Sequence, residues 1–365
     1  MGEDLSVRVV HEGTWLYPGG AERVAREIAR EFDAPVTVGH SADRSFWSDV
    51  DTEFPFQRLN DGPLASLPRG LKELALALSF RTLSFEEDLV ISSGTTAKWW
   101  SPRADQVHLH YCHSPPVRVF VDTADSITNA VVQTAVGMVD RFYADMCDEI
   151  LANSAFTADR VRRYYDRDAP VVNPPVEVDR FHHEPPEDPP YFVFVGRLDE
   201  MKRAAVVARA FRDLDAELVM VGDGPRRGKC ERAPGVTVRD RVPDDELEDL
   251  IAHCVGGIAL AEREHCGMTP KEFQAAGKPV VVPNEPNLKN HVVDDGSGVV
   301  VAPTTEGVRE GVHRVLAGDW DPKEIHATAQ DWSVGRFHET VREHVASVLD
   351  DRTSGAPLAS EAGNS

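Results

Sequence analysis

Short apolar runs followed by helix-forming segments occur in both halves of the chain. Residues 5–10 form an apolar run, and apolar side chains recur at helical spacing over residues 21–30. The second half repeats the pattern, with an apolar run at 191–195, a helical segment at 204–211 and a further apolar run at 216–221. Glycines stand at the turns between these segments. Strand, glycine turn, helix and strand in this order are the signature of a βαβ unit, so the pattern predicts an α/β protein with such units in both halves of the chain.

Prolines concentrate between the two halves, at 173–175 and 183–190. Proline combined with charge continues neither a helix nor a central strand, so the domain boundary is expected here. The chain has 365 residues, which is enough for two domains with a core each. We expect a first domain over 1–182, a second over 183–330 and a small, polar, disordered tail over 352–365.

Acidic residues outnumber basic ones by 61 to 39, which gives a formal net charge of −22, and 31 of the 39 basic residues are arginine. A strongly anionic surface repels the phosphates of nucleic acids, so we expect no nucleic acid partner. A surface poor in lysine and rich in carboxylates is also the composition with which halophiles keep their proteins soluble, and we expect a halophilic source.

The five cysteines are scattered and form no C-x-x-C pair, which argues against a disulfide framework or a zinc site and favours a reducing cytoplasm. No basic segment followed by an apolar run opens the sequence, and no run of about 18 apolar residues occurs in it. We therefore expect a cytoplasmic protein that does not span a membrane.

Residues 63–83 depart from the general acidity, because they are apolar and carry three basic residues and one acid. A helix of this kind favours peripheral contact with the anionic cytoplasmic face of a membrane or with an amphiphilic substrate. The alternative is a core helix of the first domain from which Arg69 and Lys72 extend to solvent.

Two carboxylates, Glu264 and Glu272, stand eight positions apart around Gly267 and Thr269. The first is expected in a turn after a strand and the second in the helix that follows. The free backbone N–H groups at 267–269 then lie at the helix start, where a diphosphate binds well. Carboxylates accept hydrogen bonds from sugar hydroxyls, so the pair suits a sugar nucleotide. The alternatives are the acid and base of a hydrolase, or a capped helix with surface glutamates.

Two other turns place glycines or cations after a predicted strand. Gly19 and Gly20 precede a helix and leave room for a ligand to approach the backbone, although an ordinary turn that needs positive φ explains them as well. Arg197 and Lys202 follow the 191–195 run and are suited to neutralise a diphosphate leaving group, although they also fit a solvated basic turn.

Three histidines lie in or next to one predicted strand. His108 and His110 have the same parity and share a strand face, whereas His113 has the opposite parity, which argues against a metal site formed by all three. At the strand end, His113 is a candidate hydrogen-bond donor to a sugar hydroxyl, with a structural histidine as the alternative.

These four segments, in this order over roughly residues 5–345, resemble those of the family-4 glycosyltransferases, which are retaining enzymes of the GT-B fold that use nucleotide sugars. The resemblance implies two facing Rossmann-like domains with the site in their cleft. The first domain then serves the acceptor side, the second binds the nucleotide sugar, and a helix over 331–351 crosses back to the first domain.

The family motifs also imply individual roles. Gly19 and Gly20 match the glycine-rich loop near the phosphates and the acceptor, Glu264 would contact the hexose, Glu272 the ribose, and Gly222 would lie near the base. The implied catalytic residues are His113, Arg197, Lys202 and Glu264. The implied residues for the sugar nucleotide are Gly19, Gly20, Arg197, Lys202, Gly222, Gly267, Met268, Thr269 and Glu272.

The implied activity is transfer of a hexose, with retention, from a nucleoside diphosphate sugar to a glycan or lipid-linked glycan acceptor, without a metal or other cofactor. Two positions depart from the family pattern: residues 284–290 replace its glycine loop, and Cys266 stands where phenylalanine is usual. The alternatives are a catalytically silent homologue that binds glycan or nucleotide sugar in a biosynthetic complex, and a GT-B sugar-nucleotide epimerase.

Overall fold

The structure, a computed structural model, describes residues 5–14, 19–41, 56–58, 79–116 and 127–354. Residues 63–78 of the predicted membrane-contact segment and residues 355–365 of the predicted tail lie outside these ranges. Within the described residues, no helix has the length and apolar character needed to cross a membrane.

The chain divides into two compact units. Unit 1 comprises Met1–Pro175 and Phe337–Ser365, and unit 2 comprises Val176–Arg336. The division thus falls between Pro175 and Val176 rather than at the 182/183 boundary placed from sequence. The reason is that Val176 and Val178 pack with Trp332 of unit 2, and the Val176 N–H donates to the Trp332 carbonyl at 2.7 Å.

Unit 1 is built on a parallel sheet whose strand order, within the described residues, is β3-β2-β1-β4-β5-β6. The central strands β4 and β5 are buried along their whole length, as expected for parallel strands covered on both faces. The strands are β1 (Val7–Thr14), β2 (Val36–Ser41), β3 (Phe56–Arg58), β4 (Leu89–Ser93), β5 (Val107–Cys112) and β6 (Glu149–Ala152).

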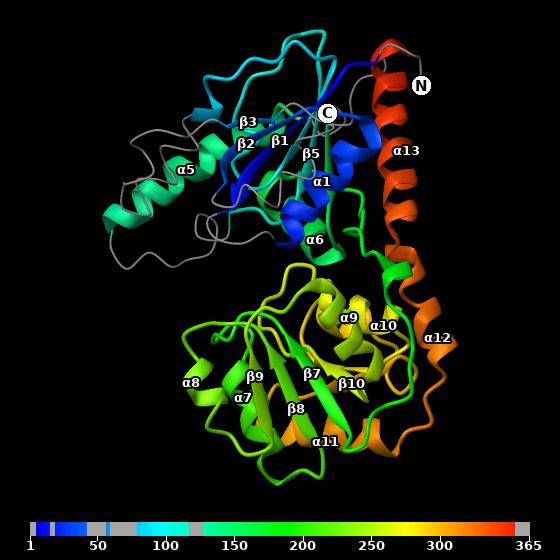
Figure 1. The fold of residues 1–365 in the computed structure, drawn as a ribbon. Helices are drawn as coiled ribbons and strands as arrows, with labels where there is room; N and C mark the ends of the chain where they lie inside the picture. The colour runs from blue at the N-terminus through cyan, green and yellow to red at the C-terminus, as the bar shows by residue number, and fades with distance from the viewer. Residues whose placement is uncertain (1–4, 15–18, 42–55, 59–78, 117–126, 355–365) are drawn as a thin grey trace. The chain divides into compact units, whose positions relative to one another are not determined.

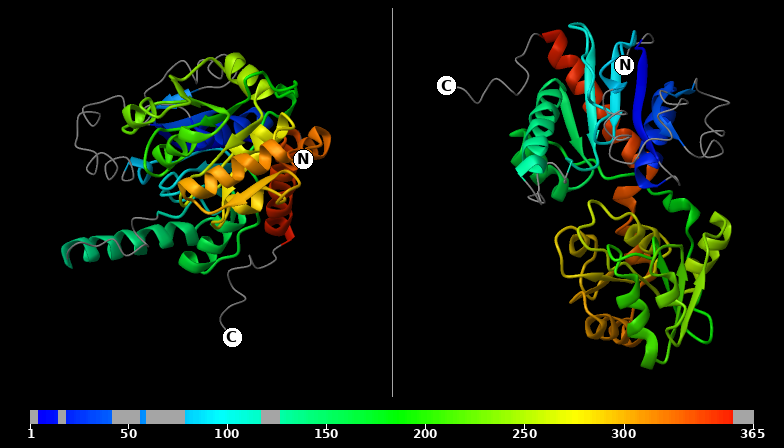
Figure 2. Two further views of the ribbon diagram at one scale, coloured as in Figure 1. Left: turned by 90° about the horizontal axis from the view of Figure 1, so that it is seen from below. Right: turned by 90° about the vertical axis from the view of Figure 1, so that its left-hand side faces the viewer.

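Helices cover both faces of this sheet (Figure 1, Figure 2). On one face, α1 and α13 bury Val24, Ile28, Phe337 and Val341 against β1, β2, β4 and β5. On the other, α5 and α6 supply the buried Tyr143, Ala144 and Val161. The helices are α1 (Gly20–Phe32), α5 (Ile127–Asp145), α6 (Ala155–Tyr165) and α13 (Val334–Ser354).

Helix α13 is the counterpart of the helix placed at 331–351 from sequence. It begins at Val334, after the 3-10 turn η5 (Gln330–Trp332), and it continues to Ser354, so residues 352–354 of the predicted tail are helical. From Phe337 to Val348 its apolar face belongs to the core of unit 1. On its flank, His344 bonds to Glu149 at 3.1 Å.

Unit 2 contains a second parallel sheet with the order β12-β11-β10-β7-β8-β9 among the described residues. Helices α7, α8 and α11 contribute to the core on one face, and α9 and α10 to the core on the other (Figure 1). The strands are β7 (Tyr191–Val195), β8 (Glu217–Val221), β9 (Val236–Arg239), β10 (Gly256–Ile258), β11 (Val280–Pro283) and β12 (Gly298–Val301). The helices are α7 (Ala204–Ala210), α8 (Arg227–Cys230), α9 (Asp244–His253), α10 (Thr269–Ala275), α11 (Thr305–Ala317) and α12 (Pro322–Ala327), with 3-10 turns η2 (Val178–Arg180), η3 (Phe211–Asp213) and η4 (Leu288–His291).

Both units therefore have the Rossmann strand order, which confirms the predicted fold class. In such a sheet, the order of strands reverses at one point, and the loops leaving the two strands there diverge. This switch point lies between β1 and β4 in unit 1 and between β7 and β10 in unit 2.

The contact between His344 of α13 and Glu149 predicts that the stability of the protein depends on pH. The hydrogen bond to Glu149 raises the pKa of His344, so the stabilisation is complete below the unfolded value of about 6.5 and is lost as the pH rises through the folded pKa. We expect His344→Gln to lower the free energy of unfolding by on the order of 1 kcal/mol near pH 5.5 and by much less near pH 9, in denaturant titrations.

The matched control is His313→Gln, which changes an exposed histidine of α11 in unit 2. Its effect should be small at both pH values. An equal loss of stability by His344→Gln at low and high pH would contradict the charge pairing with Glu149.

Candidate functional site

The switch point of unit 2 places two loops side by side. Strands β7 and β10 are paired in parallel, and the loops 196–203 and 259–268 leave their carboxyl ends. In open α/β sheets, ligands bind outside the carboxyl ends of the strands at this point. Five of the predicted site residues lie in these two loops, namely Arg197, Lys202, Glu264, Gly267 and Met268.

The loop after β7 is held against the loop after β8 by glycines. Gly222 has φ +144°, and a Cβ there would lie 2.1 Å from the carbonyl oxygen of Gly196. A Cβ on Gly224 would lie 2.6 Å from the carbonyl oxygen of Leu198. The contact is completed by the Leu198 N–H, which donates to the Asp223 carbonyl at 2.9 Å. The backbone on either side of Arg197 is thus fixed by the neighbouring loop.

Side chains organise the rest of the 196–203 loop. The carboxylate of Asp199 accepts the backbone N–H of Lys202 at 2.9 Å. The guanidinium of Arg203 forms a bidentate pair with Glu285 at 2.6 and 3.1 Å. Arg197, by contrast, has a side chain that is 78% exposed and lies 3.5 Å from Asp199, so its guanidinium is accessible to a ligand anion.

Lys202 and Glu264 form an ion pair in which Lys202 Nζ donates to Glu264 Oε2. The structure therefore brings together two of the residues that were predicted as catalytic. Both side chains are partly exposed, at 33% and 22%, so a ligand has access to the pair. An ammonium has three hydrogens to donate, and Lys202 can hold Glu264 and a second anion together.

The turn that carries Glu264 is fixed by residues 284–290, the stretch that departs from the family pattern. The buried Asn287 donates from its amide nitrogen to the carbonyls of Glu264 and Cys266, at 3.0 Å each. Its backbone has φ +79° and ψ −73°, the γ-turn region that residues with a side chain adopt rarely. Gly267, at φ +75°, leaves room for Leu288, whose Cδ2 would lie 2.6 Å from a Cβ at that position. Sequence reasoning missed this role of Asn287.

Cys266 lies inside this turn and packs with Val176, Ala275 and Trp332. Burial raises the pKa of its thiol well above the usual value, so the thiol stays protonated and acts as an apolar group. The departure from phenylalanine at this position therefore changes core packing and adds no reactive thiolate.

Helix α10 begins directly after the turn. Met268 is its N-cap and has no side-chain cap bond, and the first N–H groups of a helix have no acceptor within the helix. Glu272 lies in the first turn and is 8% exposed. Phe273 anchors the helix on β10, because a Cβ on Gly257 would lie 2.3 Å from its ring.

The opposite side of α10 is anchored by Lys271. Its Nζ donates to the carbonyls of His291 and Thr328 at 3.0 and 3.1 Å. Burial lowers the pKa of Lys271 to about 8. Residues before and after Glu272 thus bind other parts of unit 2, which fixes the direction of the helix start.

In unit 1, Gly19 and Gly20 lie at the switch point after β1, but the Gly19 amide is already bonded. Its N–H donates to Glu22 Oε2 at 2.7 Å. Burial opposes ionisation of Glu22, but hydrogen bonding and charge interaction with His11, together with the Gly19 amide, outweigh it and lower the pKa. The amide that was expected to face a phosphate instead caps α1, and Gly20 is the first residue of that helix.

His113 directly follows β5, as expected. Its Nε2 is hydrogen-bonded to Ser93 Oγ at the end of β4, at 2.9 Å, and this contact orients the ring. Beside it, the carboxylate of Glu12 accepts the Thr95 N–H at 2.6 Å and the Thr96 hydroxyl at 2.9 Å. Ser93 and Glu12 were not identified from sequence, because their proximity depends on strand order.

His108 and His110 share one face of β5, which confirms the parity argument. Both are bonded to Ser92 Oγ, at 2.8 and 2.9 Å. Burial lowers the pKa of His108 to about 3 and that of His110 well below its usual value, so both rings are neutral. Both are buried within β5, whereas His113 directly follows the carboxyl end of that strand.

Comparison with known proteins finds a family similarity over the residues of unit 2. Residues 175–332 match the family model described as glycosyl transferases group 1. The chain is 20% identical to alpha-1,3/1,6-mannosyltransferase ALG2 of Dictyostelium discoideum, over 86% of this chain and 90% of that protein. It is 28% identical to D-inositol 3-phosphate glycosyltransferase 2 of Catenulispora acidiphila, over 52% of this chain and 54% of that protein.

Solved structures resemble the whole chain. Sucrose-phosphate synthase from Thermosynechococcus elongatus superposes with a TM-score of 0.73 at 16% identity, covering 95% of this chain and 100% of that one. Anabaena HepE in complex with UDP superposes with a TM-score of 0.71 at 16% identity, covering 93% and 100%. The chain therefore has the GT-B fold, and its residues 175–332 are similar to the glycosyl transferases group 1 family.

Proposed function

We propose that the chain transfers a hexose, with retention of the anomeric configuration, from a nucleoside diphosphate sugar to a glycan or lipid-linked glycan acceptor. The observation that carries the proposal is the pairing of Lys202 with Glu264 at the switch point of a group 1 domain, beside the exposed Arg197. Two relatives support the reaction type, since their names describe a mannosyltransferase and an inositol 3-phosphate glycosyltransferase. A structural neighbour that was solved with UDP supports a nucleotide-bound sugar as the substrate.

Binding of the sugar nucleotide is proposed to follow the geometry of α10. The backbone N–H groups of Gly267, Met268 and Thr269 lie in the turn before α10 and at its first residue, where the helix dipole favours an anion, and we place the diphosphate there. Glu272 then accepts the ribose hydroxyls, and Glu264 contacts the hexose. The base is placed near Gly222, at the end of β8.

The chemical step breaks the bond between the anomeric carbon and the diphosphate oxygen. Negative charge grows on the leaving diphosphate, and Arg197 and Lys202 are positioned on one loop to stabilise it. The acceptor hydroxyl attacks from the face that the diphosphate leaves, and a diphosphate oxygen takes its proton, so the configuration is retained. The two cations supply the countercharge, and the mechanism needs no metal ion or covalent protein intermediate.

Unit 1 is proposed to serve the acceptor side. His113 has a ring orientation set by Ser93, and we assign it to a hydrogen bond with a sugar hydroxyl. Gly19 and Gly20 are assigned to close backbone approach at the start of α1, without the Gly19 N–H, because Glu22 occupies it. The lipid-linked acceptor rests on the composition of residues 63–83.

The first test is a thermal-shift screen against UDP-, GDP- and ADP-sugars in concentrated salt. A ligand that binds only the folded state raises the Tm in proportion to RT ln(1 + [L]/Kd), so the cognate sugar nucleotide should give a rise of several degrees at about 100 Kd. Free hexose serves as the control. If no sugar nucleotide raises the Tm, the proposal fails, and conversion of the sugar nucleotide without an acceptor would indicate an epimerase.

Arg197→Ala tests the charge stabilisation. Loss of a cation at the leaving group should reduce kcat by on the order of 10²-fold or more. The control is Arg241→Ala, which removes an exposed arginine outside the loop 196–203. Turnover of Arg197→Ala close to that of the unchanged protein would remove Arg197 from the catalytic residues.

Glu272→Gln tests the ribose contact, measured as the affinity for the free nucleoside diphosphate by calorimetry. Replacing a charged acceptor with an amide should weaken binding by about tenfold. Glu324→Gln is a matched control, because Glu324 also lies in the first turn of a short helix, α12, that begins with proline. An unchanged affinity for Glu272→Gln would leave Glu272 with a structural role.

A further inference from the structure

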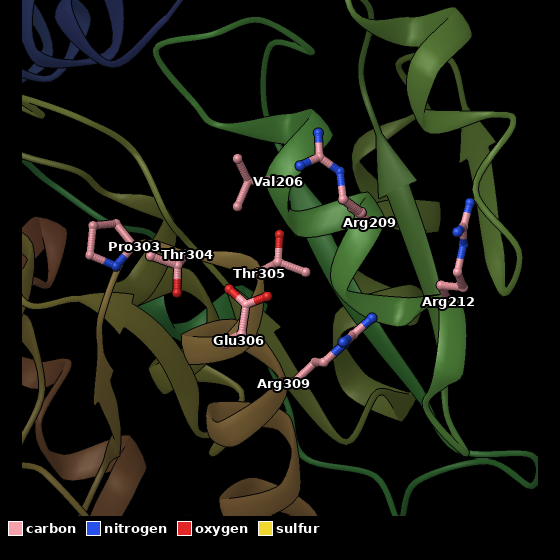
Figure 3. A pocket seen from close by; sticks show the side chains of 8 residues that line it. All are labelled: Val206, Arg209, Arg212, Pro303, Thr304, Thr305, Glu306 and Arg309. Atoms are coloured by element: carbon pink, nitrogen blue, oxygen red, sulfur yellow. The ribbon is translucent and has the colours of Figure 1, made fainter.

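A second site candidate lies on unit 2, away from the residues proposed for the sugar nucleotide. A cavity of about 480 Å³ lies between α7 with the turn η3 and the start of α11. Its polar lining is Arg209, Arg212, Thr304, Thr305, Glu306 and Arg309 (Figure 3). None of these residues belongs to the loops 196–203 and 259–268 or to α10.

The charge of this cavity is opposite to that of the chain. Three guanidinium groups and one carboxylate line it, in a protein with a formal net charge of −22. Over the described residues, no ion pair is formed by Arg209 or Arg212. Several other arginines of unit 2 are paired with carboxylates, such as Arg203 with Glu285 and Arg314 with Asp295. The lining therefore carries more cationic than anionic groups, with three guanidinium groups against the carboxylate of Glu306.

Figure 3 shows that the cations come from different elements, Arg209 and Arg212 from the α7 side and Arg309 from α11. Arg309 Nε donates to the Ala210 carbonyl at 3.0 Å, so this bond links the two elements that form the cavity. It also fixes the guanidinium at the cavity wall. This hydrogen bond thus helps to set the distance between α11 and the α7 side of the cavity.

The start of α11 supplies further donors. The helix has 13 residues, and its N-cap Thr304 accepts the Gly307 N–H with its hydroxyl at 3.1 Å. The backbone N–H groups of Thr305 and Glu306 have no acceptor within the helix, and they lie at the positive end of the helix dipole. A Cβ on Gly307 would lie 2.2 Å from the Ala302 carbonyl oxygen, so the helix start is packed tightly against the end of β12.

We propose that this cavity binds the phosphate group of a small phosphomonoester of sugar-phosphate size. Arginine side chains bind phosphate oxygens through paired N–H groups, and amides at a helix start add to that interaction. A cavity of about 480 Å³ lies in the range that holds a small molecule rather than an isolated ion. Thr304 and Thr305 supply hydroxyls for the polar remainder of the ligand.

The test uses calorimetry with glucose 6-phosphate as the probe, at low salt, because exposed charges are screened at high ionic strength. Arg209→Gln/Arg212→Gln should weaken binding by at least about tenfold. The matched control, Arg232→Gln/Arg241→Gln, removes the same charge from exposed positions outside the cavity and should leave the affinity unchanged. Equal Tm values for the two double variants would show that both are folded.

Further arms separate this site from the proposed sugar-nucleotide site. Arg197→Ala should bind the probe as the unchanged protein does, whether or not the chain proves to be a transferase. Loss of binding in Arg197→Ala would overturn the proposal, because the probe would then occupy the other site. Absence of binding to the unchanged protein, equal binding by Arg209→Gln/Arg212→Gln, or inorganic phosphate binding as tightly as glucose 6-phosphate would also overturn it.

Discussion

The arrangement of unit 2 depends on a close approach of two backbones, where the loops leaving β7 and β8 touch. No side chain fits between Gly222 and the carbonyl of Gly196, so the two strand ends can come together only with glycine at this point. That contact fixes the loop that carries Arg197 and Lys202. Lys202 in turn pairs with Glu264, which belongs to the loop after β10. The lack of a side chain at Gly222 thus affects the position of the loops on both sides of the switch point.

A second constraint operates on the side of β11. Asn287 binds two carbonyls of the turn before α10, so the residues after β11 determine the shape of the turn after β10. A buried carbonyl without a partner costs free energy, and one amide group satisfies two of them here. In the family pattern, glycines occupy the corresponding stretch, and this chain reaches a supported turn through a side chain instead.

The local features of the fold could be predicted from sequence, because they follow from patterns within a few residues. The βαβ runs, the glycine turn at Gly196 and the position of Glu272 near the start of a helix are of this kind. The partners of the site residues could not be predicted. Ser93 lies 20 positions from His113, and Asn287 lies 23 positions from Glu264, and only the strand order brings them together. Gly19 is different, because its partner Glu22 is only three residues away. A glycine N-cap lacks the hydroxyl that usually marks a capping box, so the sequence does not show the usual signature here.

The ion pair between Lys202 and Glu264 has a consequence for affinity. The ammonium of Lys202 is paired with a carboxylate of the same domain, whose effective concentration is set by the fold and not by the solution. A diphosphate that binds Lys202 therefore competes with the carboxylate of Glu264, and its observed affinity is lower than the contact with Lys202 alone would give. Ligands that engage both partners at once, the cation through phosphate and the carboxylate through a hydroxyl, avoid this competition. Under the proposed function, selectivity for a phosphate joined to a sugar over phosphate alone follows from this ion pair.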